Sequence, residues 1–125
     1  GLLGVSETSA DMRDLLRRRD ADPRAADAVS LFCSQAKKFL GGLTAAMGGL
    51  DTLVFAGGIG EHAPEVRATI CDNLTHLGLH LDPARNAANE AVISSDHSNV
   101  VIRIIATDEE LVIAQAVRSF LQYPQ

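Results

Sequence analysis

The sequence predicts an α/β fold, in which helices pack against a sheet. Two kinds of apolar pattern alternate along its 125 residues: stretches whose apolar positions recur every three or four residues, and short runs rich in apolar and β-branched side chains. One short run passes directly into Gly57-Gly58-Ile59-Gly60, a glycine-rich junction between a predicted strand and a predicted helix. This order of elements is typical of layered α/β domains, and a hydrophobic fraction of 46% is sufficient for one packed core.

The first predicted helix is polar and covers residues 6–19, with Ser6 or Thr8 as its expected N-cap. A break follows before the next helix begins. Asp22 is the expected N-cap of that next helix, because the proline behind it, Pro23, suits the first helical position.

The second predicted helix is long and amphipathic. Gly41 and Gly42 interrupt it, and each glycine costs about 1 kcal/mol relative to alanine inside a helix. We therefore expect either a bend at this point or another backbone packed closely against it. Gly48 and Gly49 end the helix. Its apolar residues recur at steps of four, three, four and four and define one face: Phe32, Ala36, Phe39, Leu43 and Met47.

The second half of the chain is predicted to alternate strands and helices. The apolar run at residues 53–56 is typical of a strand covered on both faces, and a helix begins near Pro64 and ends at Gly78. The remaining predicted elements are a short strand at 79–81, a helix at 83–91, a polar loop at 94–99, a β-branched strand at 100–106 and a helix at 107–121.

The composition weighs against several classes of function. The 16 acidic residues outnumber the 11 basic ones, which disfavours nucleic-acid binding, and the lack of Trp removes a stacking platform for single strands. No apolar run approaches the ~20 residues that cross a bilayer, so no membrane association is expected. Cys33 and Cys71 are predicted to be buried free thiols, which suits a protein of the reducing cytoplasm.

The glycine-rich junction is the strongest candidate for a binding site, because glycines let a ligand approach the main chain. A tight turn without any ligand is the simplest interpretation. A dinucleotide fold is a second one, since residues 58–63 match GxGxxG/A and Asp82 follows Gly60 by 22 positions. Against that fold, Glu61 would set a carboxylate beside a pyrophosphate, and the chain opens with a helix where the fold needs a strand.

Four segments favour a third interpretation: residues 1–6 (GLLGVS), 9–13 (SADMR), 54–62 (VFAGGIGEH) and 107–111 (TDEEL). In this order they resemble the C-terminal part of the acetate kinase family, which also holds propionate kinases. The resemblance covers essentially the whole chain and implies a ribonuclease H-like (actin-like ATPase) fold, with a mixed sheet flanked by helices. It implies that residues 1–125 form a single domain, the C-terminal nucleotide-binding part of a larger two-domain kinase.

The resemblance implies a nucleotide site built from two segments. In the family an Asp-Phe-Arg segment lines the adenine pocket, and Asp11, Met12 and Arg13 occupy its positions, with Met12 in place of the usual Phe. Taken alone, Arg13 is more typical of a solvated charge on a helix surface. His62 stands where the family usually has Asn, which makes this contact sensitive to pH near ~6.5. The second segment is the adenosine loop: Gly58, Ile59, Gly60, Glu61 and His62.

The last of the four segments implies a magnesium site. Glu109 matches the glutamate that the family uses near Mg²⁺, and Asp108 replaces the usual Asn beside it. Without the resemblance, Glu109 would be a charge that pairs with the dipole of a helix N-terminus. Glu110 is the expected capping-box partner of Thr107. Three further histidines show no metal-ligand spacing and are expected at the surface or just beneath it: His76, His80 and His97.

The family reaction is transfer of the ATP γ-phosphoryl group to acetate or a related short-chain acid, which gives acetyl phosphate and ADP. Because the family's catalytic residues lie in its N-terminal two-thirds, we expect no catalytic residue here and no turnover by these 125 residues alone. A homodimer is implied, and the apolar face of the helix at 25–47 is its candidate contact.

Two alternative functions follow from the other interpretations of the glycine-rich junction. One is an NAD-binding Rossmann-type oxidoreductase domain, and the other is a non-catalytic actin-like interaction domain. A pure interaction domain has no need of Asp11, Arg13 and Glu109, so their presence disfavours it.

Overall fold

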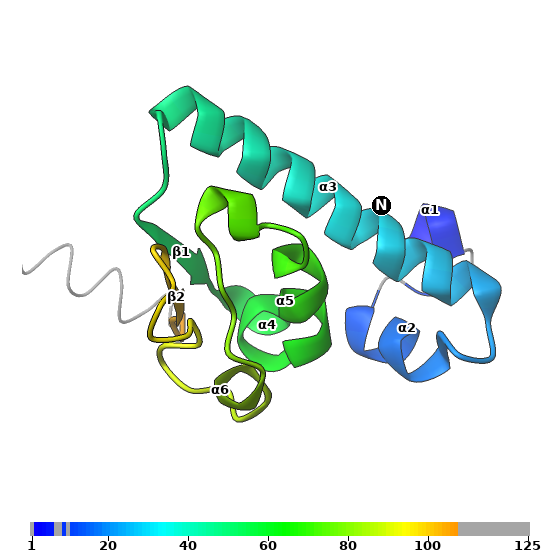
Figure 1. The fold of residues 1–125 in the computed structure, drawn as a ribbon. Helices are drawn as coiled ribbons and strands as arrows, with labels where there is room; N and C mark the ends of the chain where they lie inside the picture. The colour runs from blue at the N-terminus through cyan, green and yellow to red at the C-terminus, as the bar shows by residue number, and fades with distance from the viewer. Residues whose placement is uncertain (1, 7–8, 10, 108–125) are drawn as a thin grey trace, which may run out of the picture.

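The computed structural model describes residues 2–6, 9 and 11–107. In this part of the chain, helices pack beside a parallel pair of strands, so the predicted α/β class is confirmed (Figure 1). Figure 1 shows the long helix α3, with α1 and α2 beside its N-terminal half and the strands farther toward its other end. The elements are α1 (Leu2–Ser6), α2 (Met12–Arg18), α3 (Pro23–Met47), β1 (Thr52–Phe55), α4 (Gly57–His62), α5 (Pro64–Cys71), the 3₁₀ helix η1 (Thr75–Leu77), α6 (Pro83–Ala87) and β2 (Val101–Ile104).

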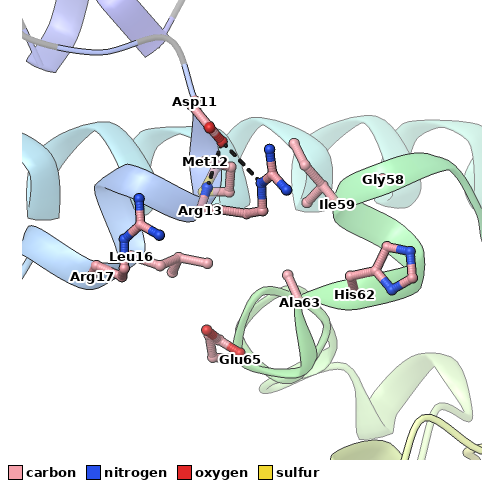
Figure 2. A pocket seen from close by; sticks show the side chains of 10 residues that line it. All are labelled: Asp11, Met12, Arg13, Leu16, Arg17, Gly58, Ile59, His62, Ala63 and Glu65. Atoms are coloured by element: carbon pink, nitrogen blue, oxygen red, sulfur yellow. Dashed lines mark hydrogen bonds and ion pairs between the residues drawn. The ribbon is translucent and has the colours of Figure 1, made fainter.

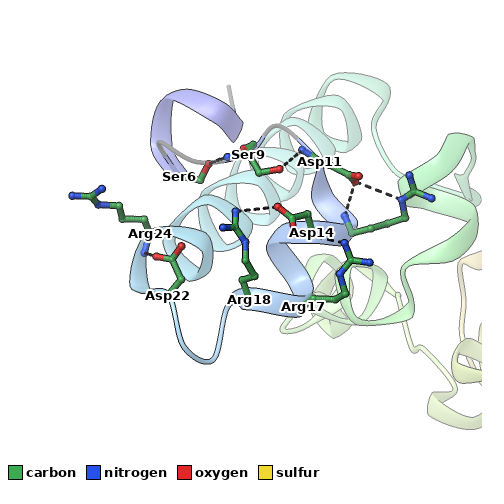
Figure 3. Close-up of polar contacts among 9 residues, drawn as sticks. Ser6, Ser9, Asp11, Asp14, Arg17, Arg18, Asp22 and Arg24 are labelled. Atoms are coloured by element: carbon green, nitrogen blue, oxygen red, sulfur yellow. Dashed lines mark hydrogen bonds and ion pairs between the residues drawn. The ribbon is translucent and has the colours of Figure 1, made fainter.

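Two short helices, α1 and α2, replace the single polar helix expected near the N-terminus. The side chain of Ser6 turns the chain between them: its Oγ donates to the Ser9 carbonyl oxygen at 2.7 Å and accepts the Ser9 N–H at 3.1 Å (Figure 3). Asp11 then caps α2 by accepting the Arg13 N–H at 3.0 Å. Ser6 is therefore not the cap of α2, and Thr8 lies outside the described residues.

Both ends of α3 follow the predicted signals. Asp22 caps the helix by accepting the Arg24 N–H at 3.0 Å, and Pro23 occupies the first helical position. Gly48 ends it in the left-handed conformation, with φ +77°, and its N–H donates to the Ala45 carbonyl oxygen at 3.3 Å.

The buried face of α3 differs from the face predicted from its large apolar residues. Phe39, Leu43 and Met47 are 71%, 59% and 64% exposed. Periodicity shows which residues share a face, whereas small side chains let neighbouring helices approach closely and so decide which face is covered. Here α1, α2 and α5 pack against α3. The buried positions of α3 are Ala25, Ala28, Val29, Cys33 and Thr44, with Phe32 and Ala36 partly buried beside them.

Strands β1 and β2 pair in parallel, in the register that places Thr52 opposite Val101. The strands predicted at 53–56 and 100–106 are thereby confirmed, with β1 shifted by one residue and β2 shorter than expected. The described part of the chain does not cover β1 on both faces as expected, because Val54 is 46% exposed. On the other edge of β2 the chain runs antiparallel, and the Ile93 N–H donates to the Ile102 carbonyl oxygen at 2.8 Å. The pairing around β2 is therefore mixed, as expected.

The glycine-rich junction is a helix and not a turn. Gly57 has φ +73°, a conformation that favours glycine and that lets the chain leave β1 and enter α4 at once. A single residue, Ala63, separates α4 from α5. The α5 helix ends at Cys71, earlier than the predicted stop at Gly78, because Asn73 turns the chain with φ +60°.

Two predicted elements after α5 are smaller in the structure than expected. The strand expected at 79–81 reduces to one bridge, between Leu81 and Ser94. The His80 N–H, which would belong to that strand, donates to the hydroxyl of Ser98 in the adjoining loop. The helix expected at 83–91 is the shorter α6, and Asn89 leaves the helical conformation with φ +51°. The helix expected at 107–121 lies outside the described residues beyond its first position.

Two apolar clusters form the core. One joins α2, α3 and α5 and contains Cys33, and the other packs around β2 and contains Cys71. Both thiols are free and buried, as predicted, and burial raises the pKa of Cys71 to about 12. Among the helices that the structure describes, none has the length and apolar character of a membrane span.

The glycine pair inside α3 generates a stability prediction. The helix continues through Gly41 and Gly42, and a Cβ at either position would meet no described atom within 4 Å. Of the two alternatives expected at this point, a bend or a closely packed backbone, the second is therefore wrong for the described part of the chain. We expect Gly42→Ala to raise the free energy of unfolding in urea by about 0.5–1 kcal/mol, because alanine adds helix propensity. Gly48→Ala is the control, and it should lower that free energy because φ +77° strains alanine. A loss of stability in both variants would contradict this prediction.

Candidate functional site

A cavity of about 650 Å³ lies between the start of α2 and the helices α4 and α5 (Figure 2). Two segments far apart in the sequence form its sides, and both contain residues predicted to bind nucleotide. Gly60 and Glu61, which were also predicted, are not part of its lining. The lining residues are Asp11, Met12, Arg13, Leu16, Arg17, Gly58, Ile59, His62, Ala63 and Glu65.

The α2 side of the cavity presents a charged pair at the helix N-terminus. The Asp11 carboxylate accepts the Arg13 N–H at 3.0 Å and lies 3.5 Å from Arg13 Nε. That N–H is the main cause that lowers the pKa of Asp11, so the carboxylate is charged at neutral pH. The Arg13 side chain is 82% exposed and extends toward Ile59, which leaves its guanidinium face available to a ligand (Figure 2). Met12, only 3% exposed, anchors α2 in the core.

The α4 side offers main chain and one apolar side chain. A Cβ at Gly58 would meet no described atom within 4 Å, so the backbone there is open to a ligand. Ile59 is half-buried, and the His62 side chain is 72% exposed. Gly60 differs from Gly58, because a Cβ on it would lie 3.2 Å from the carbonyl carbon of Phe55. Its missing side chain therefore lets α4 pack against the end of β1.

Glu61 joins α4 to the chain that follows β2. Its carboxylate accepts the Thr107 N–H at 2.7 Å and the Thr107 hydroxyl at 3.1 Å. The Thr107 N–H is the main cause that lowers the pKa of Glu61. Thr107 is the last described residue, so the predicted metal ligand Glu109, its neighbour Asp108 and the expected capping partner Glu110 lie outside the described residues.

Metal ligands are sparse in the described part of the chain, which holds no group of three His, Cys, Asp or Glu side chains that could bind an ion. The cavity itself supplies two carboxylates, those of Asp11 and Glu65. Outside it, the rings of His80 and His97 lie 5.2 Å apart, half-buried and exposed respectively, and His76 is exposed. These three positions agree with the expectation of histidines at or near the surface.

Four lining residues were missed from the sequence. Leu16 and Arg17 follow Met12 and Arg13 by four positions. This spacing places each pair on the same face of α2 and could have identified the two missed residues. The other two depend on α5 beginning immediately after α4, which the predicted glycine turn did not suggest. The missed residues are Leu16, Arg17, Ala63 and Glu65.

The geometry disfavours the dinucleotide fold. Gly58 and Gly60 lie inside α4, whereas that fold needs its glycines in a turn ahead of the helix. Asp82, the acidic residue which that interpretation requires, caps α6 by accepting the Arg85 N–H at 3.0 Å and does not line the cavity.

The contact between Glu61 and Thr107 predicts how stability depends on acid. Because the folded protein lowers the pKa of Glu61, this carboxylate stabilises the fold above the pKa of an unfolded glutamate, and the contribution is lost as pH falls through the folded pKa. We expect the free energy of unfolding to fall less steeply in Glu61→Gln than in wild type between about pH 5 and pH 3. Chemical unfolding at several pH values measures both slopes. Glu65→Gln, at an exposed position, is the control, and a Glu61→Gln slope equal to that of wild type would contradict the assignment.

Comparison with known proteins matches residues 1–115 to a model of the acetokinase family. The acetate kinase of Rhodopseudomonas palustris (strain ATCC BAA-98 / CGA009) is 50% identical over 119 residues, and the propionate kinase of Citrobacter rodentium is 49% identical over 118. Each alignment covers 94% of this chain and 29% of the relative, so the chain spans about three tenths of the length of the curated relatives it matches.

Solved structures give the same result. The acetate kinase of Porphyromonas gingivalis has a TM-score of 0.90 and 35% identity, over 97% of this chain and 31% of that one. The acetate kinase of Entamoeba histolytica has a TM-score of 0.90 and 37% identity, over 98% and 34%. The expected ribonuclease H-like (actin-like ATPase) fold is therefore confirmed. Since the family model matches residues 1–115 of 125, this chain belongs to the acetokinase family.

Proposed function

We propose that this chain is the C-terminal, nucleotide-binding part of a larger two-domain kinase, which transfers the γ-phosphoryl group of ATP to a short-chain carboxylate such as acetate or propionate. The observation that carries the proposal is the cavity in which residues 11–13 meet Gly58, Ile59 and His62. Relatives named acetate kinase and propionate kinase, 50% and 49% identical to this chain, support the reaction.

The adenine base is held on the α2 side of the cavity in this proposal. The exposed guanidinium of Arg13 stacks on the purine, because a planar cation is attracted to an aromatic face. Asp11 holds Arg13 in place and accepts hydrogen bonds from the nucleoside. Met12, which is buried, supplies an apolar surface beneath this contact.

The adenosine also contacts α4 in this proposal. Gly58 brings main chain to the nucleotide, Ile59 supplies an apolar wall, and His62 is the polar group at the edge. Gly60 and Glu61 take supporting roles. Gly60 lets α4 pack on β1, and Glu61 fixes the chain at Thr107, two residues before Glu109.

Glu109 is the proposed ligand of Mg²⁺, an ion that proteins usually bind through one or two carboxylates together with the phosphates of the substrate. When bound, the ion would neutralise charge on the phosphoryl group during transfer. The groups that act directly on the phosphoryl and the acid belong to the remaining length of the kinase, so the chain described here has no catalytic residue of its own.

A homodimer and a cytoplasmic location are part of the same proposal. The exposed apolar side chains on α3, Phe39, Leu43 and Met47, form the candidate contact with a second copy, because the described part of the chain does not cover them. The two free thiols, Cys33 and Cys71, fit a reducing compartment.

A substitution of Arg13 tests the proposed adenine contact directly. In the full-length kinase we expect Arg13→Ala to raise the KM for ATP about tenfold, because the stacking cation is lost, and to leave the KM for the acid unchanged. A coupled assay for ADP release measures both constants. Arg19→Ala, an exposed arginine just beyond α2 that does not line the cavity, is the control and should behave as wild type. Equal effects of the two substitutions would exclude the proposed contact.

Ligand choice and turnover test the function as a whole. Calorimetry of the full-length protein should show binding of ATP with Mg²⁺ and none of NAD, and a hydroxamate assay should detect acyl phosphate when a short-chain acid is added. The 125 residues alone should show no acid-dependent release of ADP. Binding of NAD would support the dinucleotide enzyme, and binding of neither nucleotide would support the interaction domain.

A further inference from the structure

A fully buried cation lies next to the cavity without lining it. Arg67, on α5, is 0% exposed, and all of its hydrogen-bond partners in the described part of the chain are neutral oxygen atoms. Burial without a carboxylate partner is costly for a guanidinium, and desolvation lowers the pKa of Arg67 from its ordinary value. A group held at this cost in the interior calls for a physical reason.

The guanidinium of Arg67 joins three helices. Its Nη1 donates to the Gly60 carbonyl oxygen on α4 at 2.8 Å. Its Nε and Nη2 donate to Oδ1 and to the carbonyl oxygen of Asn86 on α6, at 2.7 and 2.9 Å, and Nη2 also donates to Asn89 Oδ1. Asn86, itself 4% exposed, completes the link by donating from Nδ2 to the Pro64 carbonyl oxygen at 2.9 Å.

The bond to Gly60 solves a problem that the sequence creates. In a continuous helix the Gly60 carbonyl would accept the N–H of residue 64, but Pro64 has no N–H. That carbonyl is thus an orphan at the C-terminal end of α4, where a positive charge is also favoured. Arg67 supplies the missing donor from one turn farther along the chain.

The helix α4 depends on such outside support because it is only six residues long, and isolated helices of this length are unstable. On one side Gly60 lies so close to the end of β1 that a Cβ on it would be 3.2 Å from the carbonyl carbon of Phe55. On the other side Arg67 holds the Gly60 carbonyl oxygen. Together the two contacts fix the position and orientation of α4. They therefore set the direction in which Gly58 and Ile59 face the cavity.

We propose that Arg67 is a positioning residue for nucleotide binding: it replaces the donor that Pro64 lacks and holds α4 in the orientation that the nucleotide requires. The identity of the ligand rests on the proposed function, whereas the mechanical part, the ordering of α4, does not. A lysine cannot reproduce this role, because a single ammonium cannot form the fork that reaches α4 and α6 together. The guanidinium therefore acts through Gly60 and not on the nucleotide itself.

The test compares Arg67→Lys with Arg85→Lys in the full-length kinase. We expect Arg67→Lys to raise the KM for ATP about tenfold while kcat and the KM for the acid change less than twofold, because only the orientation of α4 is disturbed. Arg85 is the matched control, since its fork also binds a carbonyl oxygen, that of Ser94 at 2.7 Å, together with Asp96 at 2.8 Å, but does not reach α4. Its variant should keep the KM for ATP of wild type. A folded Arg67→Lys protein with an unchanged KM for ATP would overturn the proposal.

Hydrogen exchange of the backbone amides provides a readout that does not depend on activity. Without nucleotide, Arg67→Lys should speed exchange at residues 58–63 relative to β2, and Arg85→Lys should not. Failure of the wild-type protein to bind ATP would overturn the proposed function, whereas unchanged exchange at α4 would overturn the role of Arg67.

If Arg67→Lys does not fold, Asn89→Gly tests the role of Arg67 in its place. This substitution removes one acceptor of the Arg67 guanidinium, at an exposed residue whose φ of +51° suits glycine. It should raise the KM for ATP about twofold, and an unchanged value would contradict the proposal.

Discussion

The hydrogen bond from Arg67 to the Gly60 carbonyl oxygen, 2.8 Å long, is the constraint on which the α4 side of the cavity depends. It is needed because Pro64 both starts α5 and removes the N–H that would have continued α4. Pro64 thus interrupts the backbone hydrogen bonds between α4 and α5, two helices that meet at an angle. Arg67 on α5 supplies a side-chain hydrogen bond to α4 in their place. Asn86 extends the same network to α6, so that three short helices, none of them stable alone, support one another.

The parts of the fold that local chemistry determines could be predicted from the sequence. Asp22, Pro23 and Gly48 bound α3 as expected, because caps act within a few residues of themselves. The buried face of α3 could not be predicted in the same way. Large apolar residues such as Phe39 carry most of the hydrophobic signal, but the neighbouring helices pack on small residues such as Ala28, whose signal is weak. Which face is covered depends on how closely those neighbours fit against the small residues of α3, and apolar periodicity does not reveal that fit.

The candidate site was predictable as a set of residues but not as a geometry. The resemblance to acetate kinases identified Arg13 and Gly58, and the cavity brings them together. It did not reveal that the glycines form a helix, because glycine permits a turn and a helix equally and the choice rests on Gly57 alone adopting a positive φ in this segment. Arg67 gave no signal at all. A buried arginine looks like a surface one in the sequence, and its partner Asn86 lies 19 residues away.

The two sides of the cavity are held by contacts that do not titrate near neutral pH, and this agrees with the chemistry proposed for the kinase. Phosphoryl transfer requires exact placement of the nucleotide more than proton transfer by the protein. On one side a carboxylate, that of Asp11, stays charged because it caps α2. On the other, a guanidinium that is always protonated holds a carbonyl oxygen. Neither anchor changes its charge between pH 6 and 8, so the placement of α2 and α4 on the two sides of the cavity should not vary over that range.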